Sequence, residues 1–179
     1  MSTFILYTGL GIFIAASYKY ILNNVCSKQL LYIVLLCVLL GVFSALRGDA
    51  GTDTLAYRAI YFDESTSFSR GPLYICFNNL FSILGLPYEF FLFFVGFLTA
   101  LFSFLAMIME RKNIDPFVAG LVFFFDLYLY SFNVMRQMLA ISICLLAVSL
   151  YLREEKKKGL ILFIMAILIH SPAIIYLAI

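Results

Sequence analysis

The chain alternates between long apolar runs and short polar segments. Six runs are long enough, or nearly so, to cross a bilayer, which takes about 20 residues. They are Phe4 to Ser17, Leu30 to Leu46, Tyr88 to Met109, Phe117 to Tyr130, Val134 to Leu152 and Leu160 to Ile179. This pattern predicts an all-α fold: a polytopic transmembrane helix bundle of about six spans, forming a single domain over residues 1–179.

A polar loop, residues 47–72, and a shorter apolar segment, residues 73–86, separate the second and third runs. The shorter segment contains Asn78 and Asn79, with Gly71-Pro72 before it and Pro87 after it. It is too short to cross a bilayer. We therefore expect an interfacial or re-entrant helix there.

Composition supports a membrane protein. Hydrophobic residues make up 64% of the chain and charged residues 12%, with a mean hydropathy of +1.04. A soluble domain has about twice that charged fraction, and a small one cannot bury so much apolar surface. The net charge of +2 gives no indication of nucleic-acid binding. The four cysteines show no CxxC spacing, so we expect inert small hydrophobes and neither a disulfide framework nor a metal site.

The basic residues predict an orientation. Eight of the twelve lie in loops 18–29, 110–115 and 153–158, which the positive-inside rule assigns to the cytoplasm. Alternating spans agree with this if residues 73–86 do not cross. The first run has no basic residue before it, which favours a retained helix over a signal peptide. The basic residues left outside are all arginines: Arg47, Arg58, Arg70 and Arg136.

The loop after the second run begins RGDAGTDTLAYRAIY, residues 47–61. Arginine suits bidentate binding of phosphate or carboxylate, and glycine-rich turns can present backbone N–H groups to anions. Asp53 and Thr54 are candidates to cap a following helix that carries Tyr57. The alternative interpretation is a solvated loop with a helix cap.

The fourth and fifth runs meet at SFNVMRQ, residues 131–137. If this segment is helical, Asn133, Arg136 and Gln137 share one face, at offsets of three and four. The alternative is an arginine that extends to the interface beside a tight hairpin.

The only histidine, His170, lies in the outer half of the sixth run, and Pro172 should kink that helix. A histidine at that depth is costly unless it is paired or hydrated, so a functional role is the first hypothesis. The alternative is a histidine satisfied within the bundle core. Asp126, inside the fourth run, either pairs with a base across the bundle or lies near the outer interface.

Arg47, Asp53, Arg136 and His170 are thus predicted on one side of the membrane. Together they indicate an outward-facing cavity for an anionic ligand, with a proton acceptor beside it.

Three strings resemble motifs of the EpsG/Wzy-like polysaccharide polymerase family. Residues 47–61 resemble its R…GTD…Y…Y stretch, FNVMRQMLAISI (132–143) its N-x-x-R-Q-x-L-A stretch, and IHSPAIIYL (169–177) its H-x-S-A stretch. The order along the chain is the same. The chain departs from the last motif, because serine directly follows His170.

The resemblance implies a GT-C-like glycosyltransferase of the bacterial inner membrane with its active face outward and no cofactor or metal. It would polymerise polyprenyl-pyrophosphate-linked oligosaccharide repeats into exopolysaccharide, capsule or O-antigen. By position, Arg47 and Arg136 would hold the pyrophosphate, and His170 would be the base. Asp53, Tyr57, Asn133 and Gln137 would support the cavity. Polysaccharide-export and chain-length-control proteins would be partners.

Two other interpretations remain: a flippase for lipid-linked oligosaccharides, and a non-catalytic membrane partner or inactive fragment. Members of the family are longer, and this chain ends inside an apolar run at Ile179. We therefore expect it to be incomplete at the C-terminus.

Overall fold

The computed structural model describes residues 2–24, 28–62 and 71–178, and every regular element in those ranges is helical. In chain order these are α1 (Ser2–Asn23), α2 (Gln29–Ala45), α3 (Thr54–Phe62), α4 (Pro72–Ile83), α5 (Tyr88–Met109), α6 (Pro116–Val122), the π-helical η2 (Phe123–Tyr128), the 3₁₀ turn η3 (Tyr130–Phe132), α7 (Met135–Leu152), α8 (Lys156–Ile169) and the 3₁₀ segment η4 (Ser171–Ala178).

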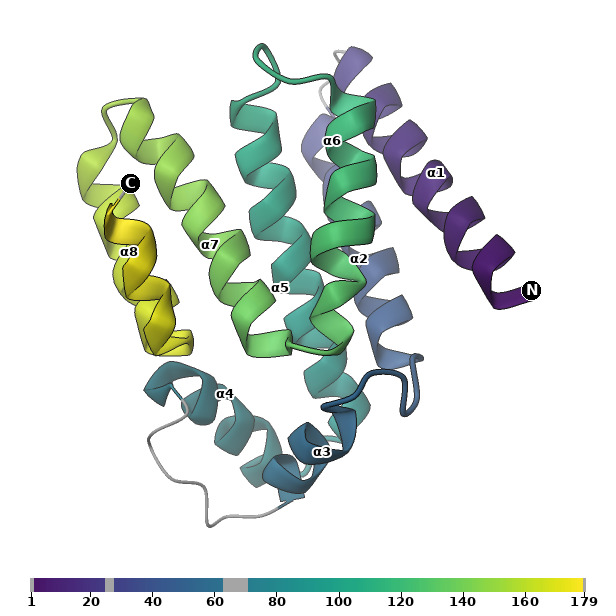
Figure 1. Ribbon diagram of the computed structural model, residues 1–179, viewed down its shortest axis with the longest axis vertical. Helices are drawn as coiled ribbons and strands as arrows, with labels where there is room; N and C mark the ends of the chain where they lie inside the picture. The colour runs from purple at the N-terminus through teal and green to yellow at the C-terminus, as the bar shows by residue number, and fades with distance from the viewer. Residues whose placement is uncertain (1, 25–27, 63–70, 179) are drawn as a thin grey trace.

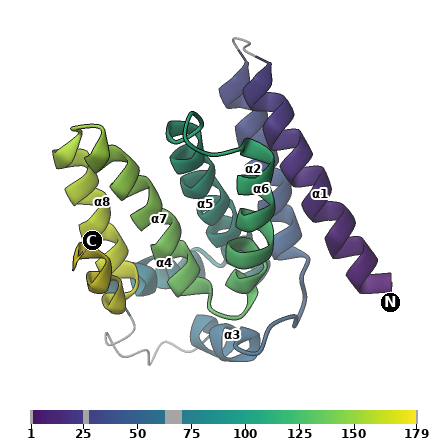
Figure 2. The same ribbon diagram turned by 45° about the horizontal axis from the view of Figure 1, so that its top comes forward.

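The long helices form one bundle with α5 and α7 at its centre (Figure 1). Helix α2 packs on α5, α1 packs on α6, and α8 packs on α7. A second view shows the same arrangement, with α1, α2 and α6 on one side of α5 and with α7 and α8 on the other (Figure 2). The all-helical bundle predicted from the apolar runs is confirmed.

Within the described residues, three helices are long and apolar enough to cross a membrane: Phe4–Asn23, Tyr88–Met109 and Met135–Leu152. Gln29–Ala45 and the composite helix Pro116–Phe132 are shorter apolar helices. The predicted third run matches α5 at both ends, and the fifth differs from α7 by one residue at its start. Large apolar side chains remain exposed on the outside of the bundle, for example Phe4 and Leu152 at 74% and 70%. Long apolar helices with apolar side chains on the outside of the bundle are typical of a membrane protein.

The bundle has two distinct ends. We call the end that carries loops 110–115 and 153–155 the lysine end, and the opposite end, crossed by α3 and α4, the α3–α4 end (Figure 1). The predicted short helix at residues 73–86 is α4, which begins on Pro72 and has only 12 residues. Its Asn78 Nδ2 donates to the Ile60 carbonyl of α3 over 3.3 Å. Polar side chains thus tie these two short helices together.

The fourth predicted run is one helix in three parts. The Asp115 carboxylate caps its start by accepting from the Phe117 and Val118 backbone N–H groups at 2.9 and 3.0 Å. The helix then widens into the π-helical turns of η2 and tightens into η3. Tyr128 anchors this irregular stretch, because its hydroxyl donates to the Leu40 carbonyl of α2.

The predicted continuous, kinked helix from Leu160 to Ile179 is wrong. Helix α8 ends at Ile169, and His170 is extended, with φ −146° and ψ 100°. Pro172 has no N–H to continue the α-helix. The following segment, η4, contacts α8 and α7. The chain therefore turns back along the bundle, and His170 lies at the turn instead of inside a kinked helix (Figure 1).

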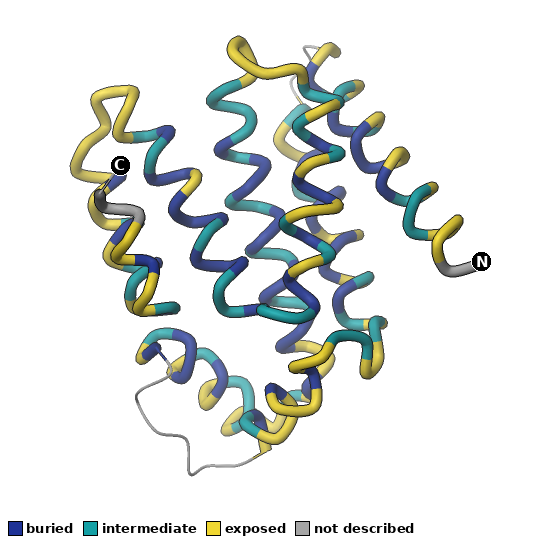
Figure 3. Tube along the Cα trace, in the orientation of Figure 1, coloured by how far each residue is buried: buried dark blue, intermediate teal, exposed yellow. Residues whose placement is uncertain are grey.

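Buried residues form two clusters along the bundle axis (Figure 3). One joins α1, α2 and α5 to η2 around Tyr18, Phe104 and Tyr128. The other joins α3, α4, α5, α7 and α8 around Phe91 and Met135. This second cluster extends to the α3–α4 end, where most of the predicted site residues lie.

Candidate functional site

Arg47 is a buried cation that follows the end of α2. Its guanidinium carbon lies 5.0 Å from the centre of the Phe132 ring. The Tyr88 hydroxyl approaches the guanidinium. Even so, none of the three buried Arg47 nitrogens completes a hydrogen bond of ordinary geometry within residues 2–24, 28–62 and 71–178. A buried charge without hydrogen bonds is unfavourable, so this cation is suited to an anionic partner.

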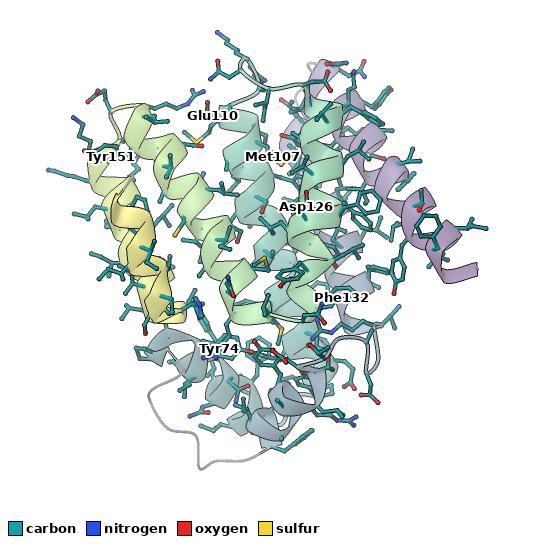
Figure 4. The ribbon with its side chains drawn as sticks, viewed as in Figure 1. Tyr74, Met107, Glu110, Asp126, Phe132 and Tyr151 are labelled. Carbon is teal, nitrogen blue, oxygen red and sulfur yellow. The ribbon has the colours of Figure 1, made fainter. Side chains whose placement is uncertain are left out.

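Arg136, on the first turn of α7, lies against Tyr74 of α4. Its guanidinium carbon is 5.7 Å from the centre of the Tyr74 ring. Tyr74 is 2% exposed, and both Arg136 and Arg47 are close enough to influence its hydroxyl electrostatically. Tyr74 therefore lies between the two arginines that the sequence singled out. Figure 4 shows Tyr74 and Phe132 at the same end of the bundle, near α3 and α4.

Aromatic rings from α3, α4 and α5 hold this region in place. The rings of Tyr57 and Tyr74 are 6.2 Å apart, and those of Tyr74 and Phe91 are 5.5 Å apart. Tyr61 packs against Tyr88 at 5.3 Å, and its hydroxyl donates to the Leu86 carbonyl over 2.7 Å. Tyr57 and Tyr61 are four residues apart, so they occupy one face of α3 and turn together toward the bundle.

The glycine-rich loop after Arg47 packs on the turn before α7. A Cβ placed on Gly51, whose φ is +110°, would lie 2.2 Å from the Phe132 carbonyl oxygen, so only glycine fits. The Thr52 N–H donates to Asn133 Oδ1 over 2.9 Å. These contacts join the loop that carries Arg47 to the segment that carries Arg136.

His170 and Gln137 line a cavity of about 160 Å³ between α7 and the turn after α8, with Ala140, Ile141 and Pro172 among the other lining residues. Burial, and then repulsion from Arg136, lowers the pKa of His170 below its ordinary value of 6.5. The imidazole is therefore neutral at pH 7, the state in which it can accept a proton.

Gly71 fixes α4 against the end of α8. Its φ is +95°, and a Cβ there would lie 2.1 Å from the Ile169 carbonyl oxygen. This close approach sets the start of the helix that carries Tyr74 beside the turn that carries His170.

The structure brings most of the predicted residues to one end of the bundle. Arg47 and Arg136 meet at Tyr74, Tyr57 packs on the same ring, and His170 and Gln137 share a cavity. The predicted shared face of Asn133, Arg136 and Gln137 is wrong in part. Asn133 precedes α7, which begins at Met135, and its side chain turns to the Thr52 loop.

Two acidic residues that the sequence singled out, Asp53 and Asp126, lie at the margin of the site. Helix α3 begins at Thr54 as expected, and the Asp53 carbonyl accepts from the Tyr57 N–H over 3.0 Å. The Asp53 side chain is exposed and accepts from the Thr52 hydroxyl at 3.4 Å. Asp126 is exposed on η2 and lines an apolar groove of about 690 Å³. Within the described parts of the chain no ion pair of Asp126 is formed, so pairing across the bundle is not seen.

Sequence reasoning missed Tyr74, Tyr88 and Phe132, which surround the arginines. The spacing of Tyr74 and Asn78, four residues apart in a short helix, is the signal that was available. It puts both on the face that α4 turns to α3 and the bundle.

A model of the EpsG family matches residues 30–179. The chain belongs to the EpsG family. The match includes all three motifs and every predicted site residue. No curated protein and no solved structure matches the chain.

Proposed function

We propose that this EpsG family protein is a glycosyltransferase that polymerises polyprenyl-pyrophosphate-linked oligosaccharide repeats at the outer face of the bacterial cytoplasmic membrane. The observation that carries the proposal is the buried guanidinium of Arg47, which completes no hydrogen bond of ordinary geometry within the described residues. A second cation, Arg136, lies against the same tyrosine, Tyr74, that Arg47 influences. Family membership supports the same role.

The chemistry of a pyrophosphate fits this pair. A lipid–pyrophosphate–sugar carries one negative charge on each phosphorus, and Arg47 and Arg136 supply two positive charges. When the sugar leaves, the released polyprenyl pyrophosphate gains a further negative charge. Positioned guanidinium groups stabilise charge that develops in this way, and they do so without a metal.

In the proposed reaction, a sugar hydroxyl of the acceptor repeat attacks the anomeric carbon of the donor glycan. The bond from that carbon to the pyrophosphate oxygen breaks, and its electron pair stays with the pyrophosphate. His170 accepts the hydroxyl proton, because its imidazole is neutral at pH 7. Gln137, which lines the same cavity, would orient the acceptor.

The proposed orientation has the lysine end in the cytoplasm and the α3–α4 end outside. It rests on the positive-inside rule. Asp49 and Lys157 are exposed at opposite ends of the bundle. After each is changed to cysteine in a cysteine-free background, an impermeant reagent should label position 49 in intact cells and leave position 157 unlabelled. Labelling of position 157 from outside would overturn the orientation.

The function is tested with Arg47→Ala, Arg136→Ala and His170→Ala in a strain that depends on this chain for its polymer. We expect each variant to stop chain elongation while single repeats still reach the outer face. Polymer chains of normal length in all three variants would overturn the site and favour a non-catalytic partner. Accumulation of lipid-linked repeats on the inner face would instead support a flippase.

A further inference from the structure

We infer that Tyr74 and Tyr88 are the neutral half of the anion site, donating their hydroxyls to a diphosphate ester held between Arg47 and Arg136. This inference rests on the proposed function and extends it to two residues outside the sequence motifs. Tyr74 and Tyr88 come from α4 and from the first residue of α5, so two further elements would contribute to the same site.

The first observation is burial without hydrogen bonding. Tyr74 and Tyr88 are 2% and 4% exposed, and neither hydroxyl has a hydrogen-bond partner in the described residues. A tyrosine hydroxyl usually finds a partner when it is buried. Two such hydroxyls beside one another therefore indicate an acceptor that comes from outside the chain.

The second observation is what the hydroxyls face. The Tyr88 hydroxyl approaches the Arg47 guanidinium, and the hydroxyls of Tyr74 and Tyr88 are near enough to influence one another. Burial raises the pKa of Tyr74 well above its ordinary value of 10.0, so the hydroxyl stays protonated and able to donate. The Tyr88 hydroxyl oxygen lies beside the Arg47 guanidinium without a hydrogen bond of ordinary geometry between them. Its O–H is therefore able to donate to an acceptor that Arg47 also binds.

The third observation separates the two parts of Tyr74. Its ring supports Arg136 at 5.7 Å, and its hydroxyl is within electrostatic reach of Tyr57 and Tyr88 as well as of both arginines. Tyr74→Phe removes the hydroxyl and keeps the ring under Arg136. Tyr74→Leu removes both. The two variants therefore distinguish hydrogen bonding to the ligand from positioning of the arginine.

The donors also indicate the size of the ligand. A guanidinium has five N–H donors, and two hydroxyls bring the possible number to about seven. A carboxylate offers two acceptor oxygens, and a phosphate monoester offers three non-bridging oxygens on a single phosphorus. A diphosphate diester offers two charges and four non-bridging oxygens. The site should therefore prefer a pyrophosphate to a monophosphate on the same lipid.

The chain provides a matched control for the loss of a buried hydroxyl. Tyr18 is fully buried, has an unpartnered hydroxyl among the described residues, and stacks on Phe104 at 4.9 Å. It belongs to the other core cluster and precedes Lys19, which pairs at the lysine end. Tyr18→Phe therefore repeats the chemical change far from the arginines.

The test is binding of farnesyl pyrophosphate and farnesyl monophosphate to the purified full chain in detergent, with thermal unfolding recorded for every variant. Tyr74→Phe and Tyr88→Phe should each weaken pyrophosphate binding about tenfold or more, the effect of one hydrogen bond to a charged group. They should also narrow the preference for pyrophosphate over monophosphate, which a general loss of folding would not change. Tyr18→Phe should bind both lipids as the wild type does.

The possible results distinguish a failure of the tyrosine role from a failure of the proposed function. If Arg47→Ala abolishes pyrophosphate binding but Tyr74→Phe and Tyr88→Phe bind as wild type, the hydroxyl role is wrong and the proposed function stands. If Arg47→Ala binds as wild type, the pyrophosphate site itself is wrong. If Tyr18→Phe loses as much affinity as Tyr74→Phe, the loss is general to buried hydroxyls and the inference is overturned.

Discussion

The two ends of the bundle differ in the surroundings of their basic residues. At the lysine end, solvent-accessible cations pair with acids of the same loop or of a neighbouring one. The pairs are Lys19–Asp115 at 3.4 Å, Arg153–Glu110 at 3.9 Å, Lys156–Glu154 at 3.2 Å and Lys158–Glu155 at 3.2 Å. At the α3–α4 end, Arg58 and Asp49 form one similar exposed pair at 3.7 Å, but Arg47 and Arg136 lie on aromatic rings. Arg47 forms no ion pair with an acid of the described residues.

This difference distinguishes charged side chains that serve solubility and membrane topology from those that are suited to binding a ligand. An exposed ion pair contributes little to stability, typically about 0.2–1 kcal/mol, and loses little when broken. A buried guanidinium costs stability unless an anion or hydrogen bonds offset it. The Arg47 guanidinium is buried and completes no hydrogen bond of ordinary geometry within residues 2–24, 28–62 and 71–178, so an anionic ligand would offset its cost.

The largest effect is expected from neutralising Arg47. Arg47→Met keeps a long side chain on the Phe132 ring and removes the charge. Polymer formation should fall by about a hundredfold or more, the size of effect seen when a group that stabilises developing charge is lost. The unfolding temperature should stay the same or rise, because an uncompensated buried charge is gone.

Arg153→Met is the matched variant at the lysine end, where the side chain pairs with Glu110 and donates to the Met109 carbonyl. It should leave polymer length unchanged. The two variants are compared by polymer length on gels and by unfolding temperature in detergent. An Arg47→Met protein that unfolds earlier and still polymerises would reverse our interpretation of the two ends.

The next largest effect is expected at Gly71, where α4 meets α8. Gly71→Ala adds a Cβ 2.1 Å from the Ile169 carbonyl oxygen at a φ of +95°. The backbone must move, which should cost about 1–3 kcal/mol of stability. It should also displace Tyr74 from Arg136, so polymerisation should fall by roughly tenfold or more.

Gly85→Ala is the control for this substitution. Its φ of +66° is also positive, although closer to the left-handed value that other residues can adopt, and no atom lies within 4 Å of the added Cβ. It should cost only about 1–2 kcal/mol of left-handed strain and spare most of the activity. Equal losses of activity in the two variants would show that the contact with Ile169 does not position the site.

A smaller effect is expected from pH through His170. Burial and repulsion from Arg136 lower its pKa below 6.5. The unfolded chain therefore binds a proton at a higher pH than the folded chain does. The histidine leaves folding stability unaffected well above pH 6.5 and reduces it as the pH falls from there through the lowered pKa. Elongation should decline over the same range, because the base becomes protonated.

The titration can be followed directly, because His170 is the only histidine. Its imidazole signal in a protein purified without a histidine tag should titrate below pH 6.5. In Arg136→Met the midpoint should rise, yet remain below 6.5 because burial is the larger cause. A wild-type midpoint at or above 6.5 would exclude the environment described here.

The sequence predicted the helices well where local pattern decides them. Apolar runs gave α5 and α7 nearly to the residue. The runs could not show that the chain turns at His170, because the residues from Leu160 to Ile179 are apolar before and after the turn. Only Pro172 marked the place, and a proline permits either a kink or an end.

The candidate site was predicted in its charges and missed in its aromatic residues. Arg47 and Arg136 are conspicuous because charge is rare in so apolar a chain. Tyr74 and Tyr88 are 2 of 12 tyrosines beside 20 phenylalanines, so nothing in their type marks them. Their importance depends on the packing of α4 and α5 around the arginines, which arises from contacts distant in sequence.

The smallest effects on unfolding and on polymer length are expected at the lysine end, from substitutions in the Lys19–Asp115 ion pair. Lys19→Met breaks the pair with Asp115 and a contact of 5.9 Å with the Phe117 ring, both of them partly exposed. It should change unfolding very little. Asp115→Ala should lower the unfolding temperature more, because its carboxylate also caps α6 through Phe117 and Val118. Neither variant should alter polymer length by more than about twofold, since exposed pairs contribute little. A large loss of polymer in Lys19→Met would mean that the lysine end also acts in the reaction, and the division between a supporting end and a reacting end would no longer hold.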